Sequence, residues 1–500
     1  MKRFIILALS LIAVTSLDAQ VIKDYAAYQF NMDRALWYNS SSAAGIARDH
    51  IAPWRNVVAG YGIENGKFTD SWGSQSQLSL SLGGDMLMNV SGFRIAAGLS
   101  LESNRLGKSH YNTALYDVTW DMPYFAAVNT DMSFLWRQSH AVVDIKAATP
   151  LFINDMFSAG LAFKMDMKGA SKSADPSCRY RGMNLEIAPS LTVAVNEENI
   201  VGLTAAYRMN PARSAVSSDN PNSSVLFLTG LGDYTVKWMG DDLTLGPMEY
   251  TGTSVGAALQ YNHISELSDW LLELSFDKWE TSVVEEDVQR GRVDKFITGF
   301  SATGLFGERR NRKFSFNVDY NLFYWLQGAN NTAVANNGAV DANLDYTLYT
   351  GVRRRSFDWM MGLGMDMSLL ALKKANPWTS VDSKLGSTNL LPYAFLGKNI
   401  SIAPGHSLLA KLKMGYNFSM NNYFKYGGAD SEGNLIVNSM LDDELDYLGS
   451  YFVHSGFSAD YTYRFNEMMS AYASLGGTLL SPMGSKQSRG ILTIKVGLLF

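Results

Sequence analysis

The last eleven residues of the chain, GILTIKVGLLF (490–500), place an apolar side chain at nearly every second position. Counting back from Phe500, the residues that share its strand face are Leu498, Val496, Ile494 and Leu492. Lys495 and Thr493 fall on the opposite face, because successive side chains of a strand alternate. The stretch is therefore predicted to be a β-strand with one apolar face and one mostly polar face, a pattern that half-buried strands of soluble proteins share.

The same alternation recurs along most of the chain. In KFSFNVDYNLFYWLQ (313–327), Phe314 and Phe316 oppose Ser315 and Asn317, and similar patterns occupy 157–168 and 407–418. The chain is 47% hydrophobic, its mean hydropathy is −0.06, and beyond residue 20 it contains no long uninterrupted apolar run. Apolar residues spread thinly at every second position are typical of transmembrane β-strands, which meet lipid on one face only.

The spacers between these segments indicate how many strands there are and how they are joined. We expect short turns at 196–199, 307–312, 353–356 and 465–468, and long loops at 169–180, 212–246, 328–339, 372–388 and 421–448. Short turns on one side and long loops on the other are typical of an outer-membrane barrel. Fifteen strands are predicted from about residue 131 onward, and the less regular region 53–122 adds one or three. The total is therefore about 16–18.

The N-terminal residues differ from the rest. MKRFIILALSLIAVTSLDAQ (1–20) has two basic residues, an apolar run and a small-residue site near Ala19, which is the pattern of a secretory signal peptide. Residues 20–52 do not alternate and are predicted to form a short helix and a small-residue loop. The expected organisation is a signal peptide at 1–19, a lead-in or plug at 20–52, and an antiparallel up-and-down all-β transmembrane barrel at 53–500 in the outer membrane of a Gram-negative bacterium.

The C-terminal strand resembles the signal by which the assembly machinery recognises bacterial outer-membrane β-barrel proteins. The matching positions are Leu492, Ile494, Val496, Leu498 and Phe500, although Leu498 stands where an aromatic residue is commoner. The whole chain looks most like the large outer-membrane barrels that carry only domain-of-unknown-function labels. The stretch WYNSSSAAGIA (37–47) is also similar to a small-residue motif of fatty-acid-transport-like barrels, with Asn39-Ser40 in place of the usual Asn-Pro or Asn-Ala.

The inward face of such a barrel is the place to look for function. The strand registers place charged side chains of both signs there. The candidate lumen-lining residues are Lys164, Asp166, Arg208, Glu273, Asp319, Asp366, Lys411, Lys413, Asp460 and Arg464. A barrel of this size is too wide to be filled by side chains alone. Mixed charges suit a hydrated lumen and an internal salt-bridge lattice equally well.

Other site classes find little support in the sequence. None of the six His residues lies in a recognisable catalytic motif, so we expect no enzyme activity. The acidic stretch LDDELDYLG (441–449) lacks the spacing of a calcium loop, and we expect no metal site and no cofactor. The single cysteine, Cys178, cannot form an internal disulfide, and a formal net charge of −5 gives no nucleic-acid footprint.

Three functions fit this barrel. The first is a passive or loop-gated channel for small solutes. The alternatives are a non-conducting membrane anchor that docks an envelope protein partner, and a hydrophobic-ligand transporter with residues 20–52 as a hatch. The expected partners are outer-membrane lipid, the barrel-assembly machinery through the C-terminal strand, and an unnamed solute.

Overall fold

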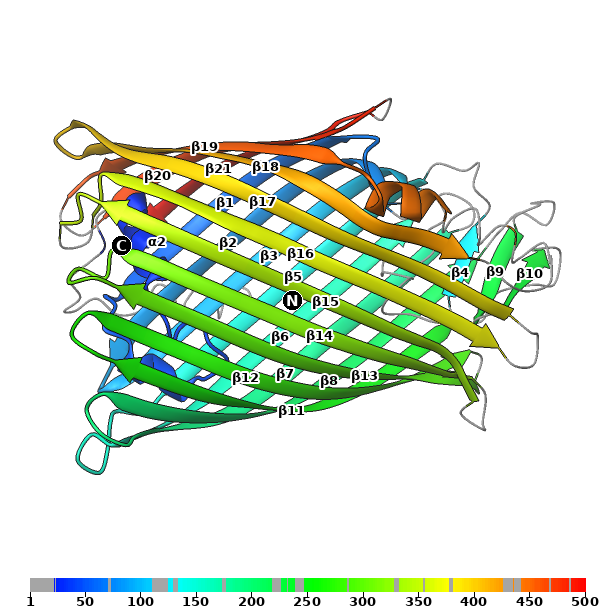
Figure 1. Cartoon of the computed structure of the whole chain (residues 1–500), viewed down its shortest axis with the longest axis horizontal. Coiled ribbons are helices and arrows are strands. Elements are labelled where there is room, and N and C mark those ends of the chain that lie inside the picture. The colour runs from blue at the N-terminus through cyan, green and yellow to red at the C-terminus, as the bar shows by residue number, and fades with distance from the viewer. Residues whose placement is uncertain are drawn as a thin grey trace.

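The computed structural model is a closed antiparallel β-barrel of 18 strands (Figure 1). It describes residues 22, 24–70, 73–109, 125–128, 134–172, 177–217, 226–231, 233–238, 247–285, 287–327, 332–353, 356–376, 381–425, 435, 442–466, 469–484 and 487–500. The wall consists of β1 (Trp54–Gly66), β2 (Ser74–Val90), β3 (Phe93–Ser109), β5 (Phe134–Ala148), β6 (Phe157–Lys172), β7 (Ser177–Ala194), β8 (Asn199–Ser217), β11 (Met248–Ile264), β12 (Ser268–Glu285), β13 (Val288–Phe306), β14 (Arg312–Gln327), β15 (Thr332–Thr350), β16 (Trp359–Asn376), β17 (Val381–Ala403), β18 (His406–Lys425), β19 (Phe452–Arg464), β20 (Ser470–Pro482) and β21 (Arg489–Leu499). The upper predicted strand count is confirmed, with fifteen strands after residue 131 and three before it.

The C-terminal strand closes the barrel, as predicted. β21 pairs with β20 on one side and with β1 on the other, where Tyr61 lies opposite Ile494. The last residue continues the pairing, because the Phe500 and Arg55 backbones exchange two N–H···O bonds of 3.0 and 2.9 Å. Closure leaves no open sheet edge in the hydrocarbon, where unpaired backbone groups would be costly.

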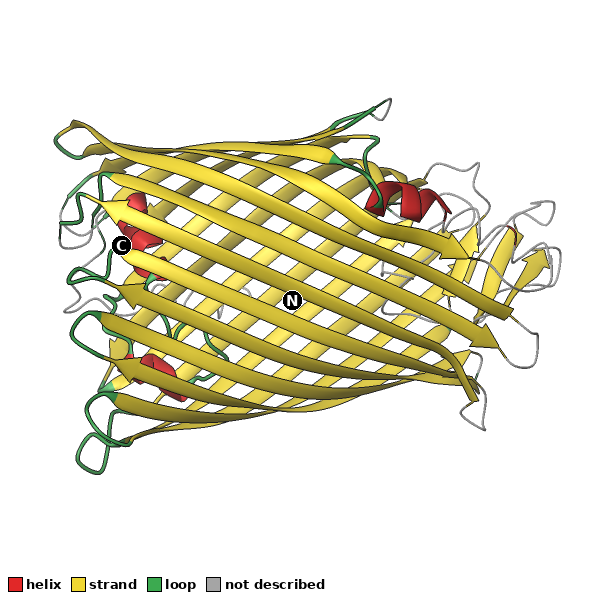
Figure 2. Cartoon of the chain, viewed as in Figure 1, coloured by secondary structure: helices red, strands yellow, loops and turns green. Residues whose placement is uncertain are grey.

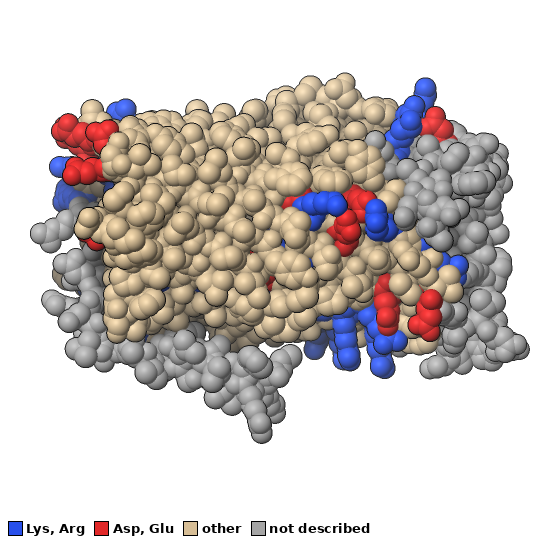
Figure 3. All heavy atoms as spheres, turned by 90° about the horizontal axis from the view of Figure 1, so that it is seen from below, with Lys and Arg blue, Asp and Glu red and all other residues tan. Residues whose placement is uncertain are grey.

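The outer face of the wall is apolar. The side chains of Ile494 and Val496 are 47% and 55% exposed on the outside, as are many Leu, Phe, Tyr and Met side chains of the other strands. Figure 3 shows a broad uncharged band on this surface, with charged side chains gathered toward the two ends of the barrel. Together, this band and the closed sheet satisfy the two physical requirements for spanning a membrane with strands.

The two ends of the barrel differ in their connections. At one end, here the turn end, short connections such as 195–198, 307–311 and 404–405 join the strands. The opposite end, here the loop end, carries the long connections 110–133, 218–247 and 426–451. The long loops predicted at 212–246 and 421–448 correspond to the second and third of these connections.

The prediction of long loops at 169–180, 328–339 and 372–388 is wrong, because much of each range belongs to strands. β6 continues to Lys172 and β7 begins at Ser177, and the other two connections are shortened in the same way. The strand ladder extends beyond the apolar band, where Ser and Lys side chains can face water without ending the hydrogen-bonded pairing. Residues 173–176, 328–331 and 377–380 lie outside the described residues.

Elements outside the wall gather at the two ends (Figure 2). At the loop end, β4 (Phe125–Val128), β9 (Leu226–Leu231) and β10 (Asp233–Trp238) form a separate three-stranded sheet. At the turn end, helix α2 (Tyr25–Asp33) and the 3₁₀ helix η1 (Ala44–Arg48) belong to the N-terminal segment. Within the described part of the chain, no helix has the length and apolar character of a membrane-spanning segment. Residues 1–19, the expected signal peptide, lie outside the described residues.

Candidate functional site

The candidate site is the lumen and the N-terminal segment, residues 22–52, that occupies its turn end (Figure 1). The segment begins with α2, where the Asp24 side chain accepts a 2.6 Å hydrogen bond from the Ala27 backbone N–H and caps the helix. Burial raises the pKa of Asp24, while that hydrogen bond and the charge of Arg464 act against the rise. Arg464 thus lies at the turn end, close enough for its charge to act on the segment.

Helix α2 packs against wall strands from two sides. The Tyr28 hydroxyl donates a 2.8 Å hydrogen bond to Asp85 of β2, and Lys411 of β18 donates to Gln29. The fully buried Phe30 ring stands edge-on to Tyr349 of β15 with ring centroids 4.8 Å apart. An aromatic ring and two polar anchors therefore bind one short helix to three separate strands.

The next part of the segment follows the wall along β5, β11 and β12. The Trp37 indole N–H donates to Asn262 at 3.2 Å, and Ser41 donates to Glu273 at 2.8 Å. From β5, the Lys146 ammonium donates to the backbone oxygens of Tyr38 and Ser40 at 2.9 and 2.6 Å. Carbonyl groups that no helix or sheet uses are satisfied by a wall lysine, which fixes the backbone path.

The 3₁₀ helix η1 lies in close contact with β6 and β7. The Ala44 N–H donates to the Ser190 hydroxyl at 2.8 Å, and the Ser158 hydroxyl donates to the Ala44 carbonyl at 3.0 Å. At Gly160 of β6 an added Cβ would collide with the Ala44 backbone nitrogen, so glycine is needed there for the backbones to approach. Ala43 completes a small-residue cluster with Ala162 and Ala188.

The segment ends around a buried carboxylate, Asp49. This side chain accepts N–H bonds from Trp37 and Tyr38 at 3.1 and 2.6 Å, which folds the segment back on itself. Burial raises the pKa of Asp49 to about 7, although the two N–H groups and Arg94 of β3 oppose the rise. Arg94 also donates to the backbone oxygen of Ile51 at 2.7 Å.

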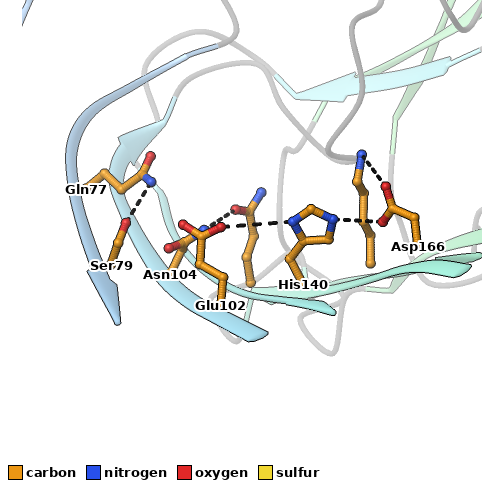
Figure 4. Close-up of polar contacts among 8 residues, drawn as sticks. Gln77, Ser79, Glu102, Asn104, His140 and Asp166 are labelled. Atoms are coloured by element: carbon orange, nitrogen blue, oxygen red, sulfur yellow. Dashed lines mark hydrogen bonds and ion pairs between the residues drawn. The ribbon is translucent and has the colours of Figure 1, made fainter. Parts of the chain in front are cut away.

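Beyond the segment, the inner wall of β3–β12 carries a lattice of charges. Arg208 donates to Glu186 at 2.6 Å and also to Asp277, so one guanidinium joins β7, β8 and β12. His140 lies between Asp166, at 2.7 Å, and Glu102, at 3.9 Å, with Lys168 4.0 Å from Asp166 (Figure 4). The predicted lumen-lining residues Asp166 and Arg208 therefore belong to two networks, and Lys164 lies opposite Glu186 in the β6–β7 register.

The inner wall of β14–β18 is acidic and rich in amides. Asp319 lies opposite Asp341, and Asn343 donates to Asp366 at 2.5 Å. These side chains line a cavity of about 430 Å³ that Tyr447 of the β18–β19 connection also borders. The sequence predicted Asp319 and Asp366 to line the lumen but did not single out Asp341 and Asn343, which also face it.

The remaining predicted lumen residues also lie on the inner face. Lys411 contacts the N-terminal segment, and the Lys413 ammonium lies 3.5 Å from the centroid of the Tyr393 ring. Asp460 accepts a 2.5 Å hydrogen bond from Ser474. Glu273 contacts the segment instead of facing open lumen. Among the described residues, no three His, Cys, Asp or Glu side chains are placed to hold a metal ion.

Sequence reasoning missed Asp85, which collects three donors. Besides Tyr28, the Trp54 indole donates to Asp85 at 2.6 Å and the Asn56 amide donates at 3.0 Å. The glycine pair 83–84 directly before this carboxylate obscures the alternation of β2, so the inward position of Asp85 could not be read from the pattern. Lys146 was missed because its partners are carbonyl groups, which no sequence pattern reveals.

The fold and the polar interior together define a large β-barrel of the outer-membrane type whose lumen holds a segment of its own chain. The chain belongs to the family described as "Family of unknown function (DUF6850)", whose model matches residues 43–500. The resemblance to the large uncharacterised barrels is therefore confirmed. The similarity of residues 37–47 to fatty-acid-transport-like barrels stays a prediction.

Solved structures resemble the chain only in fold. The ferripyoverdine receptor of the Pseudomonas aeruginosa outer membrane is 9% identical, with 90% of this chain and 72% of that chain covered and a TM-score of 0.44. The alcaligin outer-membrane receptor FauA of Bordetella pertussis is 10% identical, with 88% and 75% covered and a TM-score of 0.43. A bacterial polysaccharide outer-membrane secretin is 9% identical, with 90% and 97% covered and a TM-score of 0.34. No curated protein matches the chain.

Proposed function

We propose that the protein is an outer-membrane channel for small hydrophilic solutes, and that residues 22–52 gate its turn end. The observation that carries this proposal is the attachment of the segment to inner faces around the wall, from β2 through β6 and β12 to β15 and β18. A segment that only led into the barrel would need contacts near β1 alone. Contacts on many strands instead support a position across the opening.

The character of the inner wall supports a hydrophilic solute. The lattice around Arg208 and the acid-amide wall near Asp366 offer charges and hydrogen-bonding groups to water and polar solutes. A transporter of hydrophobic ligands would need an apolar binding site in the lumen. The three carboxylates on the lining of the 430 Å³ cavity, Asp319, Asp341 and Asp366, disfavour that alternative.

The segment is attached by contacts that can be exchanged for water. Most of its anchors are single hydrogen bonds, each contributing about 1 kcal/mol net. Between the segment and β12–β14 there is also a cavity of about 400 Å³, bordered by Asp33, Asn39 and Lys313. A closed state held by many modest bonds beside a polar cavity can open without disturbing the wall.

The unequal connections at the two ends of the barrel support an orientation in the membrane. We propose that the signal peptide at 1–19 is removed after export and that the β21 pattern ending at Phe500 engages the assembly machinery. Because outer-membrane barrels have short periplasmic turns and longer extracellular loops, the proposed orientation has the turn end facing the periplasm and the loop end facing the outside of the cell.

A disulfide tether tests the gate directly. In a Cys178→Ala background, Ala43→Cys and Ala162→Cys introduce thiols into one small-residue cluster that joins the segment to β6. In planar bilayers, the oxidised protein should stay closed, and reduction should restore the openings of the parent. The single Ala162→Cys variant is the matched control, because it has the same wall substitution without a tether.

The same experiment can contradict the proposal. If the oxidised and reduced forms conduct alike while gel mobility shows the disulfide, movement of the segment does not gate the channel. Silence of both forms and of the parent would exclude a passive channel.

A docking role is the second candidate, and the separate sheet of β4, β9 and β10 favours it. These strands come from two loops that are distant in the sequence, 110–133 and 218–247, and pair at the loop end. Ordered structure built from loops can present a surface to an envelope protein partner. A partner that copurifies stoichiometrically, and is lost when 226–238 is replaced by a short linker, would support this role.

A further inference from the structure

A row of arginines lies on the outer face of the barrel near the loop end. It consists of Arg105 on β3, Arg137 on β5 and Arg179 and Arg181 on β7, here called the arginine row. All four are exposed. Each shares its strand face with outward apolar residues, such as Leu135 on β5 and Ile187 on β7, so the guanidinium groups point away from the lumen.

The strand register places these residues side by side. Arg105 lies directly opposite Arg137, and Arg137 lies opposite Ser171 of β6. Ser171 in turn lies opposite Arg179, and Arg181 lies opposite Arg213 of β8. Like charges directly across a strand pair repel each other, so the Arg105–Arg137 pair is costly unless an anion lies between the two side chains.

The arginine row has no acidic partner on the part of the wall that the structure describes, and the next strands provide the contrast. Arg213 lies 3.5 Å from Glu249, Lys278 lies 2.7 Å from Glu280, and Arg292 lies 2.7 Å from Asp294. On β8–β13, therefore, each of these outward cations has a carboxylate partner from the same chain. On β3–β7 the arginines have no carboxylate partner among the described residues, so their charge is free to meet another anion.

The arginine row stands at the edge of the apolar band. One or two outward positions closer to the turn end, the same strands and β6 between them carry Leu101, Ala141, Met167 and Met183, which follow one another in the strand register. Between these and the arginines lie the outward serines Ser103 and Ser139, also opposite each other. Figure 3 shows charged side chains of both signs on the outer surface toward the loop end, beyond the uncharged band. This is the level at which lipid headgroups meet a barrel wall.

We propose that the arginine row binds a phosphorylated glycolipid of the outer leaflet, with a lipid-A-type headgroup. Arginine binds phosphate oxygens through paired N–H groups and keeps its charge at any physiological pH. Acyl chains then lie against the apolar side chains below the row, and the serine hydroxyls face the sugar.

The width of the row selects this class of lipid. From β3 to β7 the arginines cross three strand spacings, roughly 14 Å at about 4.8 Å each. A glycerophospholipid brings a single phosphate, which cannot reach both the Arg105–Arg137 pair and the Arg179–Arg181 pair. A diphosphorylated disaccharide can place one phosphate at each pair.

Lipid retention tests the proposal. The wild-type protein and a variant with Arg105→Gln, Arg137→Gln, Arg179→Gln and Arg181→Gln are extracted in mild detergent, and the bound lipid A is counted by native mass spectrometry. We expect retention to fall by more than about tenfold, because a single hydrogen bond to a charged group is already worth about that factor. The matched control is Lys278→Gln with Arg292→Gln, which removes outward cations that have carboxylate partners and should leave retention unchanged.

A second measurement needs no variant. Delipidated wild-type protein is titrated with diphosphorylated lipid A, with its dephosphorylated form, with phosphatidylglycerol and with inorganic phosphate, and the thermal unfolding midpoint is recorded. Only the first should raise the midpoint, and high salt should weaken the effect. Equal shifts with dephosphorylated lipid A, phosphatidylglycerol or inorganic phosphate, or equal retention by the arginine variant that migrates as a folded barrel, would overturn the proposal.

Discussion

The turn end and the middle of the lumen use polar residues in opposite ways. At the turn end, wall residues such as Lys146 and Asp85 form hydrogen bonds with residues 22–52. At the middle of their strands, Arg208 and Asp366 bond to other wall residues, and Asp366 borders open space. The difference teaches that a wide barrel can keep a polar interior along its length and still restrict passage at one level.

The largest expected effect on the contacts at the turn end comes from removing the aromatic ring that anchors α2 to the wall. Phe30→Ala removes a fully buried ring that packs on Tyr349 and Phe357. We expect docking of the segment to weaken by about 3–5 kcal/mol, with faster hydrogen exchange at 24–34 and an unchanged barrel. Phe276→Ala, on the lipid-facing side, is the control. If hydrogen exchange at 24–34 is unchanged in Phe30→Ala, the Phe30 ring does not hold the segment on the wall.

A smaller effect is expected from adding a side chain at Gly160, where β6 and η1 are in close contact. Gly160→Val adds carbon atoms where even a Cβ would collide with the Ala44 nitrogen, so η1 must move away from β6. Overpacking of this kind typically costs about 1–3 kcal/mol. Limited proteolysis should then cut within 40–52, whereas Gly338→Val, with nothing within 4 Å of its Cβ, should not expose that stretch.

The lattice that joins Glu186, Arg208 and Asp277 can be tested through its arginine. Arg208→Gln leaves the carboxylates of Glu186 and Asp277 without their shared cation. We expect the barrel to lose about 1–3 kcal/mol of stability and the open channel to shift toward cation preference in a salt gradient. A shift toward anions would contradict the placement of this lattice along the solute path.

The smallest effect is a pH dependence of the gate. Burial raises the pKa of Asp49 to about 7 in the folded segment, above its ordinary value of 3.8. The stabilisation linked to protonation is therefore fully present below about pH 4 and is lost as the pH rises through 7. Openings should be more frequent at about pH 8 than at about pH 5.5, and Asp49→Asn should flatten that dependence.

The wall could be predicted from sequence because its pattern is local. Alternation in stretches such as 313–327 and 490–500 follows from two-sided strands and needs no knowledge of partners. The region 53–122 was less regular for a physical reason. Val57 and Val58 are both apolar although they face opposite sides of β1, and Gly83-Gly84 interrupts the pattern of β2.

The site was harder to predict because its contacts join distant residues. Tyr28 meets Asp85 and Gln29 meets Lys411 only once the barrel has closed around the segment. The arginine row was missed for a related reason, since Arg179 fell in an expected loop at 169–180 that is largely strand. Charge identity was visible in the sequence, but the neighbour across the sheet was not.

The most direct test of the central claim is single-channel conductance of the folded protein with and without residues 22–52. The account predicts rare or small openings for the full mature chain and large, frequent steps after the deletion, with the barrel itself intact. Equal conductance of the two folded forms would contradict a gate formed by the N-terminal segment.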